Sequence, residues 1–202
     1  MKKTVVIIPT YNEIENISLI INSLFNINLT LDVLVVDDNS PDGTSKVVKN
    51  LMDKYKKKLF LEKKDKKEGL GVAYVHGFNW ALARNYDYIF QMDADLSHNP
   101  NELKKMTTRL DLDADVIIGS RYKNGVNVIN WPLSRILLSY IASIYVRSIT
   151  SMPIKDPTSG FVGYKKEVLE ALDINRIKFV GYAFQIEMKY KAWIKGFNLI
   201  EE

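Results

Sequence analysis

Short apolar runs alternate with longer segments of helical period along the first 120 residues of the chain. The runs, rich in Val and Ile, cover 4–8, 33–36, 59–61, 88–92 and 116–118, and the helical segments between them cover 14–26, 43–56, 70–84 and 101–110. Continuous hydrophobic strands separated by amphipathic helices predict a mainly parallel sheet with helices on both faces. We therefore expect an α/β fold of the Rossmann-like, doubly wound kind.

The alternation weakens beyond residue 125. The pattern there predicts a long apolar helix over 132–150, a loop over 153–158, an extended segment over 161–164, a helix over 182–195 and a strand over 197–200. Two interpretations of the segment 131–152 stay open, a helix packed in the core and an interfacial helix resting on a membrane. Trp131 and the flanking Arg135 and Arg147 suit the second. Its uncharged stretch, 136–146, is shorter than the roughly 20 residues that span a bilayer, so we expect no membrane crossing.

Composition narrows the classes of function. A chain of 202 residues that is 47% hydrophobic and 26% charged fits one globular domain. Lys and Arg number 28 against 24 Asp and Glu, an excess too mild to indicate a nucleic-acid partner but suited to anionic phosphates or an anionic leaflet. With no Cys and two His, any metal has to rest on carboxylates. The lysine-rich stretch 54–67 is interpreted as a solvated helix end and loop.

Polar residues follow the predicted strands, where open α/β sheets bind their ligands. Asp93 and Asp95 come directly after the apolar run 88–92. In extended chain an Asp-x-Asp pair places both carboxylates on one side, and Mg²⁺ typically takes one or two protein carboxylates together with substrate phosphates. Two solvated loop acids are the alternative, and the position at a strand end favours the metal site.

A second acidic pair, Asp37 and Asp38, ends the run 33–36. Adjacent strand residues face opposite sides, so only one of the pair is expected to line a site. The turn that follows contains Asn39, which tolerates a positive φ, and Asp42 or Thr44, either of which can cap the next helix.

Seven stretches resemble, in order, the motif set of glycosyltransferase family 2, which has the GT-A fold, and within it that of the dolichyl-phosphate mannose synthases. They are Ile8-Pro-Thr-Tyr-Asn-Glu13, Val36-Asp-Asp-Asn-Ser-Pro-Asp-Gly-Thr44, Gly69-Leu-Gly-Val-Ala-Tyr74, Met92-Asp-Ala-Asp-Leu-Ser-His98, Gly119-Ser-Arg-Tyr122, Thr158-Ser-Gly-Phe161 and Gly181-Tyr-Ala-Phe-Gln185. The resemblance covers nearly the whole chain. It implies one GT-A domain over 1–202, with a nucleotide-sugar-binding half (1–120) and an acceptor half (121–202).

The resemblance also implies roles for single residues. The nucleoside would be held by Pro9, Tyr11, Glu13, Val36 and Asp38. The diphosphate and a Mg²⁺ or Mn²⁺ ion would be met by Asp93, Ala94 and Asp95, with Asp93 and Asp95 as metal ligands. The acceptor phosphate would face Arg121, Arg135 and Ser139. Helix geometry supports the last two, because positions 135 and 139 are i and i+4.

The implied activity is metal-dependent, inverting transfer of a sugar, expected to be mannose from GDP-mannose, to a dolichyl or polyprenyl phosphate. A phosphate acceptor is already anionic and needs a cation such as Arg121 rather than a general base. Gln185, where a base would be expected, with Glu187 two residues later, favours this acceptor. The alternatives are a related transferase with a glucose or amino-sugar donor, and an inactive nucleotide-sugar-binding module.

Three departures from the family pattern stand out. Asn39 replaces a usual glycine, and Ser97 replaces a glutamine that completes the metal shell in some relatives. Relatives continue past the final strand into further basic residues and often membrane helices, whereas this sequence stops at Glu202. We therefore expect an incomplete acceptor half, a peripheral position on the cytoplasmic face of a membrane, and an anchor from another subunit or a further C-terminal segment.

Overall fold

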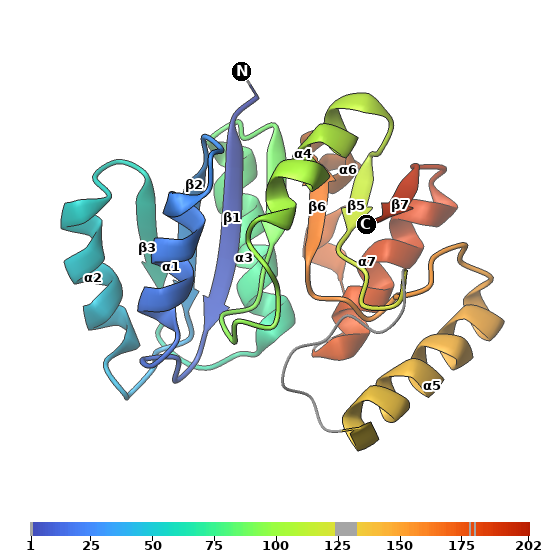
Figure 1. Ribbon diagram of the computed structural model, residues 1–202, viewed down its shortest axis with the longest axis horizontal. Coiled ribbons are helices and arrows are strands. Elements are labelled where there is room, and N and C mark those ends of the chain that lie inside the picture. Colours follow the sequence, from blue (N-terminus) through green and yellow to red (C-terminus); the bar gives the residue numbers. More distant parts are fainter. Residues whose placement is uncertain (1, 124–132, 178, 180) are drawn as a thin grey trace.

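The protein, described by a computed structural model over residues 2–123, 133–177, 179 and 181–202, is a seven-stranded sheet between two layers of helices (Figure 1). The strands are β1 (Thr4–Thr10), β2 (Asp32–Asp37), β3 (Leu59–Lys63), β4 (Tyr88–Gln91), β5 (Val116–Ile118), β6 (Val162–Lys165) and β7 (Leu199–Glu201). The helices are α1 (Ile17–Asn26), α2 (Thr44–Lys54), α3 (Leu70–Ala83), α4 (Glu102–Leu112), α5 (Leu133–Thr150), α6 (Lys166–Ala171), a 3₁₀ turn (Ile174–Arg176) and α7 (Tyr182–Ile194). The predicted α/β class is confirmed.

The sheet is mainly parallel, in the order β3-β2-β1-β4-β6-β5-β7. Only β6 runs against its neighbours β4 and β5. Gly163 on β6 lies opposite Phe90 and Ile117, and a Cβ there would come within 2.3 Å of the Phe90 ring and 2.8 Å of Ile117. Glycine is therefore required for this strand to enter between the other two.

The sheet separates two hydrophobic clusters, one on each face. The alternation of β1 feeds both, because Val5 and Ile7 belong to one cluster and Val6 and Ile8 to the other. Helix α1 covers one face with residues at helical spacing, Ile17, Ile20, Ile21 and Leu24, and is joined there by side chains of α2 and α4. Helices α3, α6 and α7 cover the other face.

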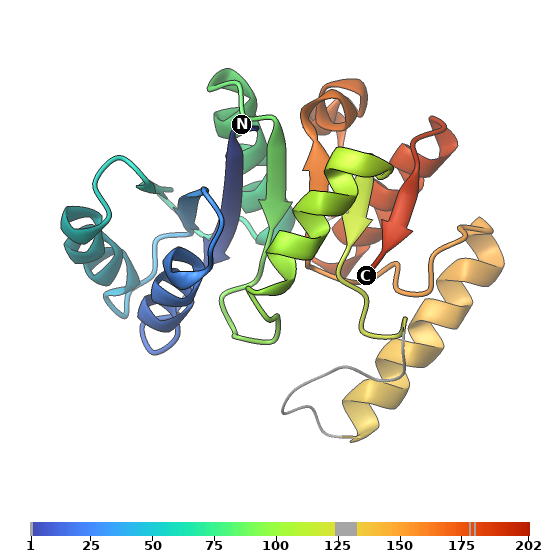
Figure 2. The same ribbon diagram turned by 45° about the horizontal axis from the view of Figure 1, so that its top comes forward.

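Helix α5 stands apart from the two layers, at the lower right of Figures 1 and 2. Its Tyr140 ring contacts Tyr122 edge-on, with 5.5 Å between the ring centroids, and Ser143 on the same helix is buried. Its outward surface is apolar and exposed at Leu137, Leu138, Ile141, Ile144, Tyr145 and Ile149. These side chains do not fit a helix buried in the core. No helix among the described residues is long and apolar enough to cross a bilayer.

Candidate functional site

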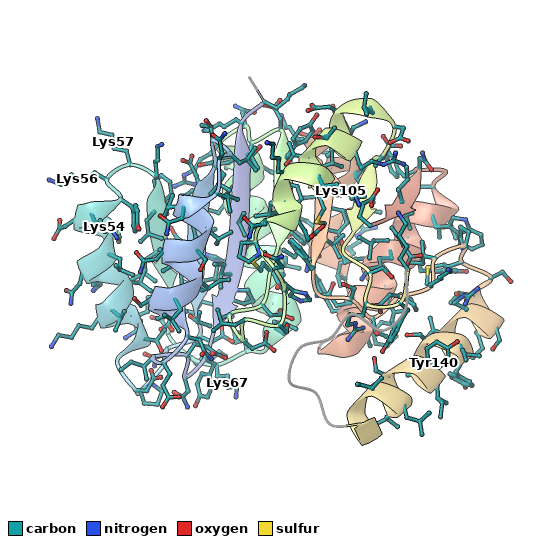
Figure 3. The ribbon with its side chains drawn as sticks, viewed as in Figure 1. Lys54, Lys56, Lys57, Lys67, Lys105 and Tyr140 are labelled. Atoms are coloured by element: carbon teal, nitrogen blue, oxygen red, sulfur yellow. The ribbon has the colours of Figure 1, made fainter. Side chains whose placement is uncertain are left out.

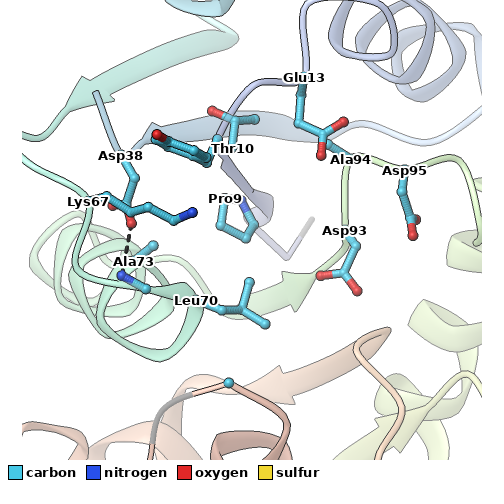
Figure 4. Close-up of a pocket in the computed structure, with 13 residues that line it drawn as sticks. Pro9, Thr10, Glu13, Asp38, Lys67, Leu70, Ala73, Asp93, Ala94 and Asp95 are labelled. Carbon is cyan, nitrogen blue, oxygen red and sulfur yellow. Dashed lines mark hydrogen bonds between the residues drawn. The ribbon is translucent and has the colours of Figure 1, made fainter. Parts of the chain in front are cut away.

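A cavity of about 390 Å³ opens at the carboxyl ends of β1, β2 and β4, where the α/β pattern predicts a ligand site (Figure 4). Most residues expected to bind the donor line it, namely Pro9, Tyr11, Glu13, Asp38, Asp93, Ala94 and Asp95. Its wall also includes residues that the sequence reasoning did not assign to the site, namely Thr10, Lys67, Gly69, Leu70, Ala73 and Gly181.

Val36 lies elsewhere than its expected role suggests. The residue pairs with Pro9 in the β1–β2 ladder, which brings its backbone beside the cavity. Its side chain is fully buried in the hydrophobic cluster shared with α3 and does not line the cavity.

Of the acidic pair Asp37 and Asp38 at the end of β2, only one lines the cavity, as predicted. Asp37 is buried and accepts hydrogen bonds from Thr10 Oγ1 at 3.0 Å and Ser40 Oγ at 2.6 Å, so it secures the turn. Asp38 lines the cavity, and its Oδ2 accepts hydrogen bonds from the backbone N–H groups of Glu68 and Gly69 at 3.1 and 3.0 Å. Asp38 therefore shapes the segment before α3 as well as the cavity wall.

The turn after this pair also follows its prediction. Asn39 has a φ of 59°, the left-handed conformation expected of it. Asp42 Oδ1 accepts a hydrogen bond from the N–H of Thr44 at 2.9 Å, which satisfies one of the free donors at the start of α2.

Asp93 is held by side chains to which the motif reading gave no role. Tyr74 donates its hydroxyl to Asp93 Oδ1 at 2.9 Å, and His98 Nε2 lies 3.8 Å from Oδ2. Burial by itself would raise the pKa of Asp93, but His98, Tyr74 and the charge of Arg121 outweigh it and lower the pKa. Asp93 is therefore ionised near neutral pH. Tyr74 and His98 both belong to family motifs, 69–74 and 92–98, so the sequence did carry a signal for them.

Asp95 and Glu13 make the cavity strongly acidic together with Asp93. Asp95 Oδ1 accepts a hydrogen bond from the N–H of Ser97 at 3.0 Å. The pKa of Glu13 is raised, chiefly by burial and further by the charges of Asp95 and Asp93, against a lowering hydrogen bond from Asn16. Negative charge thus gathers at one end of the cavity, an arrangement suited to a divalent cation.

The lysine-rich segment is only partly a solvated stretch. Lys56 and Lys57 project outward beyond the end of α2 (Figure 3), in line with the prediction, whereas the exposed Lys54 donates a hydrogen bond to Asn22 Oδ1 at 2.8 Å. Lys64, by contrast, forms a buried ion pair with Asp38 at 3.1 Å. Lys67 lines the cavity and stands 3.7 Å from the centre of the Tyr11 ring (Figure 4). The end of this segment therefore belongs to the site.

Arg121 is buried in a bidentate ion pair, which the sequence reasoning did not foresee. Its Nε and one terminal nitrogen donate to Asp156 at 2.7 and 2.6 Å, and the same terminal nitrogen donates to Thr158 at 2.7 Å. Burial would raise the pKa of Asp156, but the hydrogen bonds and charge of Arg121 outweigh it and lower the pKa. The guanidinium is thereby oriented rigidly, at a distance from which its charge still acts on Asp93.

The other residues expected at the acceptor lie on α5. The Arg135 side chain and Trp131 fall outside the described part of the chain. Ser139 is half-buried, and its carbonyl accepts the Ser143 hydroxyl at 2.9 Å. The helix meets the Arg121 segment through the ring contact of Tyr140 with Tyr122.

Gln185 and Glu187 on α7, considered as candidates for a general base, are both engaged in other interactions. Gln185 is buried beside Gln91, with 3.4 Å between the amides. Glu187 forms an ion pair with Lys191 at 2.6 Å and accepts a hydrogen bond from the N–H of Phe179 at 3.0 Å.

Comparison with known proteins agrees with the motif pattern. The profile of Glycosyl transferase family 2 matches residues 5–173. The chain is 42% identical over 200 residues to polyprenol monophosphomannose synthase of Mycolicibacterium smegmatis, covering 99% of this chain and 76% of that protein. It is 38% identical to undecaprenyl-phosphate mannosyltransferase of Micrococcus luteus, with shares of 98% and 81%.

Solved structures with a similar fold are more distant in sequence. A mannosyltransferase from Pyrobaculum calidifontis in complex with GDP-Man and Mn²⁺ has a TM-score of 0.66 at 19% identity, and the chain spans 54% of its length. Glucosyl-3-phosphoglycerate synthase from Mycobacterium tuberculosis has a TM-score of 0.75 at 16% identity, with 68% of its length spanned. With its ordered motifs, its acid-lined cavity and its profile match, the chain belongs to glycosyltransferase family 2.

Proposed function

We propose that this chain transfers mannose from GDP-mannose to a polyprenyl phosphate with inversion at the anomeric carbon. The observation that carries the proposal is the proximity of two oppositely charged features at one sheet edge. An acidic cavity contains Asp93 and Asp95, and the segment 156–160, which packs on Asp93 through Gly160, binds the buried Arg121 guanidinium through Asp156 and Thr158. The names of the mycobacterial and micrococcal relatives support the sugar and the lipid phosphate.

The cavity fits a divalent cation held by Asp93 and Asp95. The lowered pKa of Asp93 keeps its carboxylate charged, and the pKa of Glu13 is raised by burial first and then by the charges of Asp95 and Asp93. Mg²⁺ or Mn²⁺ would take these carboxylates together with the donor's phosphates. When bound, such an ion stabilises the negative charge that develops on the leaving diphosphate.

The remaining residues of the cavity would bind the nucleoside. The Tyr11 ring and Pro9 provide apolar surface, and Lys67 provides a cation beside that ring. Asp38 fixes the neighbouring backbone at Glu68 and Gly69, which sets the width of this end of the cavity. We assign residues 1–120 to donor binding and 121–202 to acceptor binding, with Gly181 of the second half also lining the donor cavity.

A phosphate acceptor accounts for the absence of a poised base among the described residues of α7. A phosphate monoester attacks as an anion and needs orientation by a cation, and Asp156 and Thr158 hold the Arg121 guanidinium in a fixed position. Glu187, in its pair with Lys191, is not needed to remove a proton.

The exposed apolar surface of α5 supports a peripheral contact with the membrane that carries the acceptor. This surface includes Leu138, Ile141 and Tyr145, and such a surface binds the headgroup region without spanning the bilayer. We propose that the protein acts on the cytoplasmic face of this membrane, with further anchoring from another subunit or segment.

A donor panel tests the function. GDP-mannose, UDP-glucose and UDP-N-acetylglucosamine are each incubated with a short polyprenyl phosphate and Mn²⁺, and lipid-linked sugar is measured. We expect product from GDP-mannose alone, its loss on chelation, and its loss in Asp95→Ala but not in Asp53→Ala, an exposed acid on α2. Transfer from a UDP-sugar, or retained turnover in Asp95→Ala, would reject the assignment.

A further inference from the structure

Lys189 on α7 is a fully buried lysine with no assigned role. Lysine is almost never completely buried unless it is paired, because its ammonium loses hydration. Among the described residues, Lys189 Nζ donates hydrogen bonds to two neutral backbone carbonyls, that of Ser159 at 2.8 Å and that of Gln185 at 3.2 Å. The Lys189 ammonium has thus exchanged its hydration for two hydrogen bonds to backbone carbonyls. This suggests that it serves to hold those carbonyls in place.

The charged groups around Lys189 include Asp93 and Arg121 of the proposed site. Burial lowers the pKa of Lys189 to about 7, while Asp156, Asp93 and Glu201 oppose this effect and Arg121 adds to it. Asp93 and Arg121 are thus among the charges that act on the Lys189 amine.

The carbonyl that Lys189 holds stands in the middle of the segment 156–160, whose two ends serve different parts of the site. At one end, Asp156 and Thr158 bind the Arg121 guanidinium. At the other end, Gly160 packs so closely on Asp93 that a Cβ there would lie 2.5 Å from Oδ2. A shift of this segment would therefore displace Arg121, which is proposed to orient the acceptor phosphate, together with Asp93, which is proposed to bind the metal.

Other contacts hold the segment from different sides. The Ser159 hydroxyl donates to the carbonyl of Gly119 at 2.7 Å, and the N–H of Asp156 donates to Glu201 at 2.8 Å. These bonds connect the segment to the ends of β5 and β7. Lys189 supplies the connection to α7, beneath the site.

We propose that Lys189 is a positioning residue for sugar transfer, which holds the segment 156–160 so that Arg121 and Asp93 keep their mutual geometry. The proposal rests on the proposed function for its kinetic consequences. Its structural part, that Lys189 fixes this segment, holds independently of the substrate.

The test compares Lys189→Met with Lys195→Met, which removes an exposed lysine from the end of the same helix. Three quantities are measured: amide hydrogen exchange of residues 156–160 without ligand, the Kd of GDP with Mn²⁺, and the acceptor KM. We expect local exchange to rise and both constants to rise roughly tenfold in Lys189→Met, the size typical of lost support around a ligating residue. Lys195→Met should change none of them.

Chemical rescue covers the case in which Lys189→Met does not fold. Because the chain has no cysteine, a Lys189→Cys variant can be aminoethylated at this position alone, unfolded and then refolded. The product carries an ammonium on a side chain of lysine length. It should restore local exchange and both constants, whereas carbamoylmethylation, which adds a neutral group, should not.

The outcomes distinguish a positioning role of Lys189 from a merely structural role and from failure of the proposed function. Unchanged exchange at 156–160 overturns it, as does raised exchange with both constants unchanged, since Lys189 would then be structural only. Equal recovery with the neutral and the cationic group also overturns it. If no GDP binds and no sugar is transferred even by the wild type, the proposed function fails, while the exchange measurement still decides what Lys189 holds.

Discussion

Replacing Asp156 by asparagine should destabilise the protein strongly, because it leaves the buried Arg121 guanidinium without its counter-charge. Asp156 is 0% exposed, and it accepts hydrogen bonds from the Arg121 backbone N–H at 3.0 Å and from two side-chain nitrogens at 2.7 and 2.6 Å. Breaking a buried pair from one side costs about 3–5 kcal/mol. For a protein of this size, this corresponds to a Tm lower by roughly 6–20 °C.

The pH dependence of the effect follows from the lowered pKa of Asp156. The carboxyl has a pKa of 3.8 when unperturbed and a lower value in the folded protein. Its contribution to stability is therefore complete above the unfolded value and is lost as pH falls through the folded value. The difference in unfolding free energy between wild type and Asp156→Asn should stay constant from neutral pH to about pH 5 and shrink below about pH 4.

Urea unfolding followed by circular dichroism, at several pH values, measures this difference. The double variant Arg121→Met with Asp156→Leu is the control, because replacing both members of a buried pair by apolar groups costs little or even stabilises. It should be more stable than Asp156→Asn. A loss below about 1 kcal/mol at neutral pH, or a double variant less stable than the single one, would refute the reasoning.

Three further predictions concern the proposed activity. Asp95→Ala should abolish metal-dependent transfer with an unchanged circular dichroism spectrum, because it removes a ligand at a strand end rather than core; retained turnover with the same metal requirement would contradict this. Arg121→Lys should raise the acceptor KM more than the donor KM, because lysine cannot keep the bidentate pair with Asp156 that orients this cation, and equal rises in steady-state assays would place Arg121 on the donor. Ile141→Asp with Ile144→Asp, both exposed on α5, should leave the protein folded but reduce flotation with anionic vesicles and activity on long-chain acceptors, while unfolding would show that the residues stabilise the core.

The regular part of the fold could be predicted because it depends on local periodicity. Each apolar run became a strand and each segment of helical period a helix, within a few residues at the ends. Helix α6 escaped prediction because six residues are too few to display a period. The antiparallel direction of β6 escaped because a four-residue apolar strand carries no sign of its direction, which is set by partners distant in sequence.

Residues that line the cavity could be predicted where they belong to a motif, whereas residues that only hold another residue in place could not. Asp93 and Asp95 could be assigned from their place after a strand. Asp156 and Lys189 could not, because the pairing of Asp156 with Arg121 spans 35 residues and Lys189 acts through a backbone carbonyl. Only the tertiary structure brings such groups together.

The position of β6 between β4 and β5 affects how the chain folds while it is being synthesised. The outer edge of β4, 88–91, pairs with 162–165, so some 70 residues must follow β4 before that edge is covered. At about 5–20 residues per second, this edge stays open for roughly 4–14 s on the ribosome. During that interval the apolar α5 segment is also emerging. An uncovered strand edge beside an apolar helix favours pairing between nascent chains. Slow translation, or a substitution that weakens β6, should therefore reduce the yield of soluble protein by more than the change in folded-state stability alone would predict.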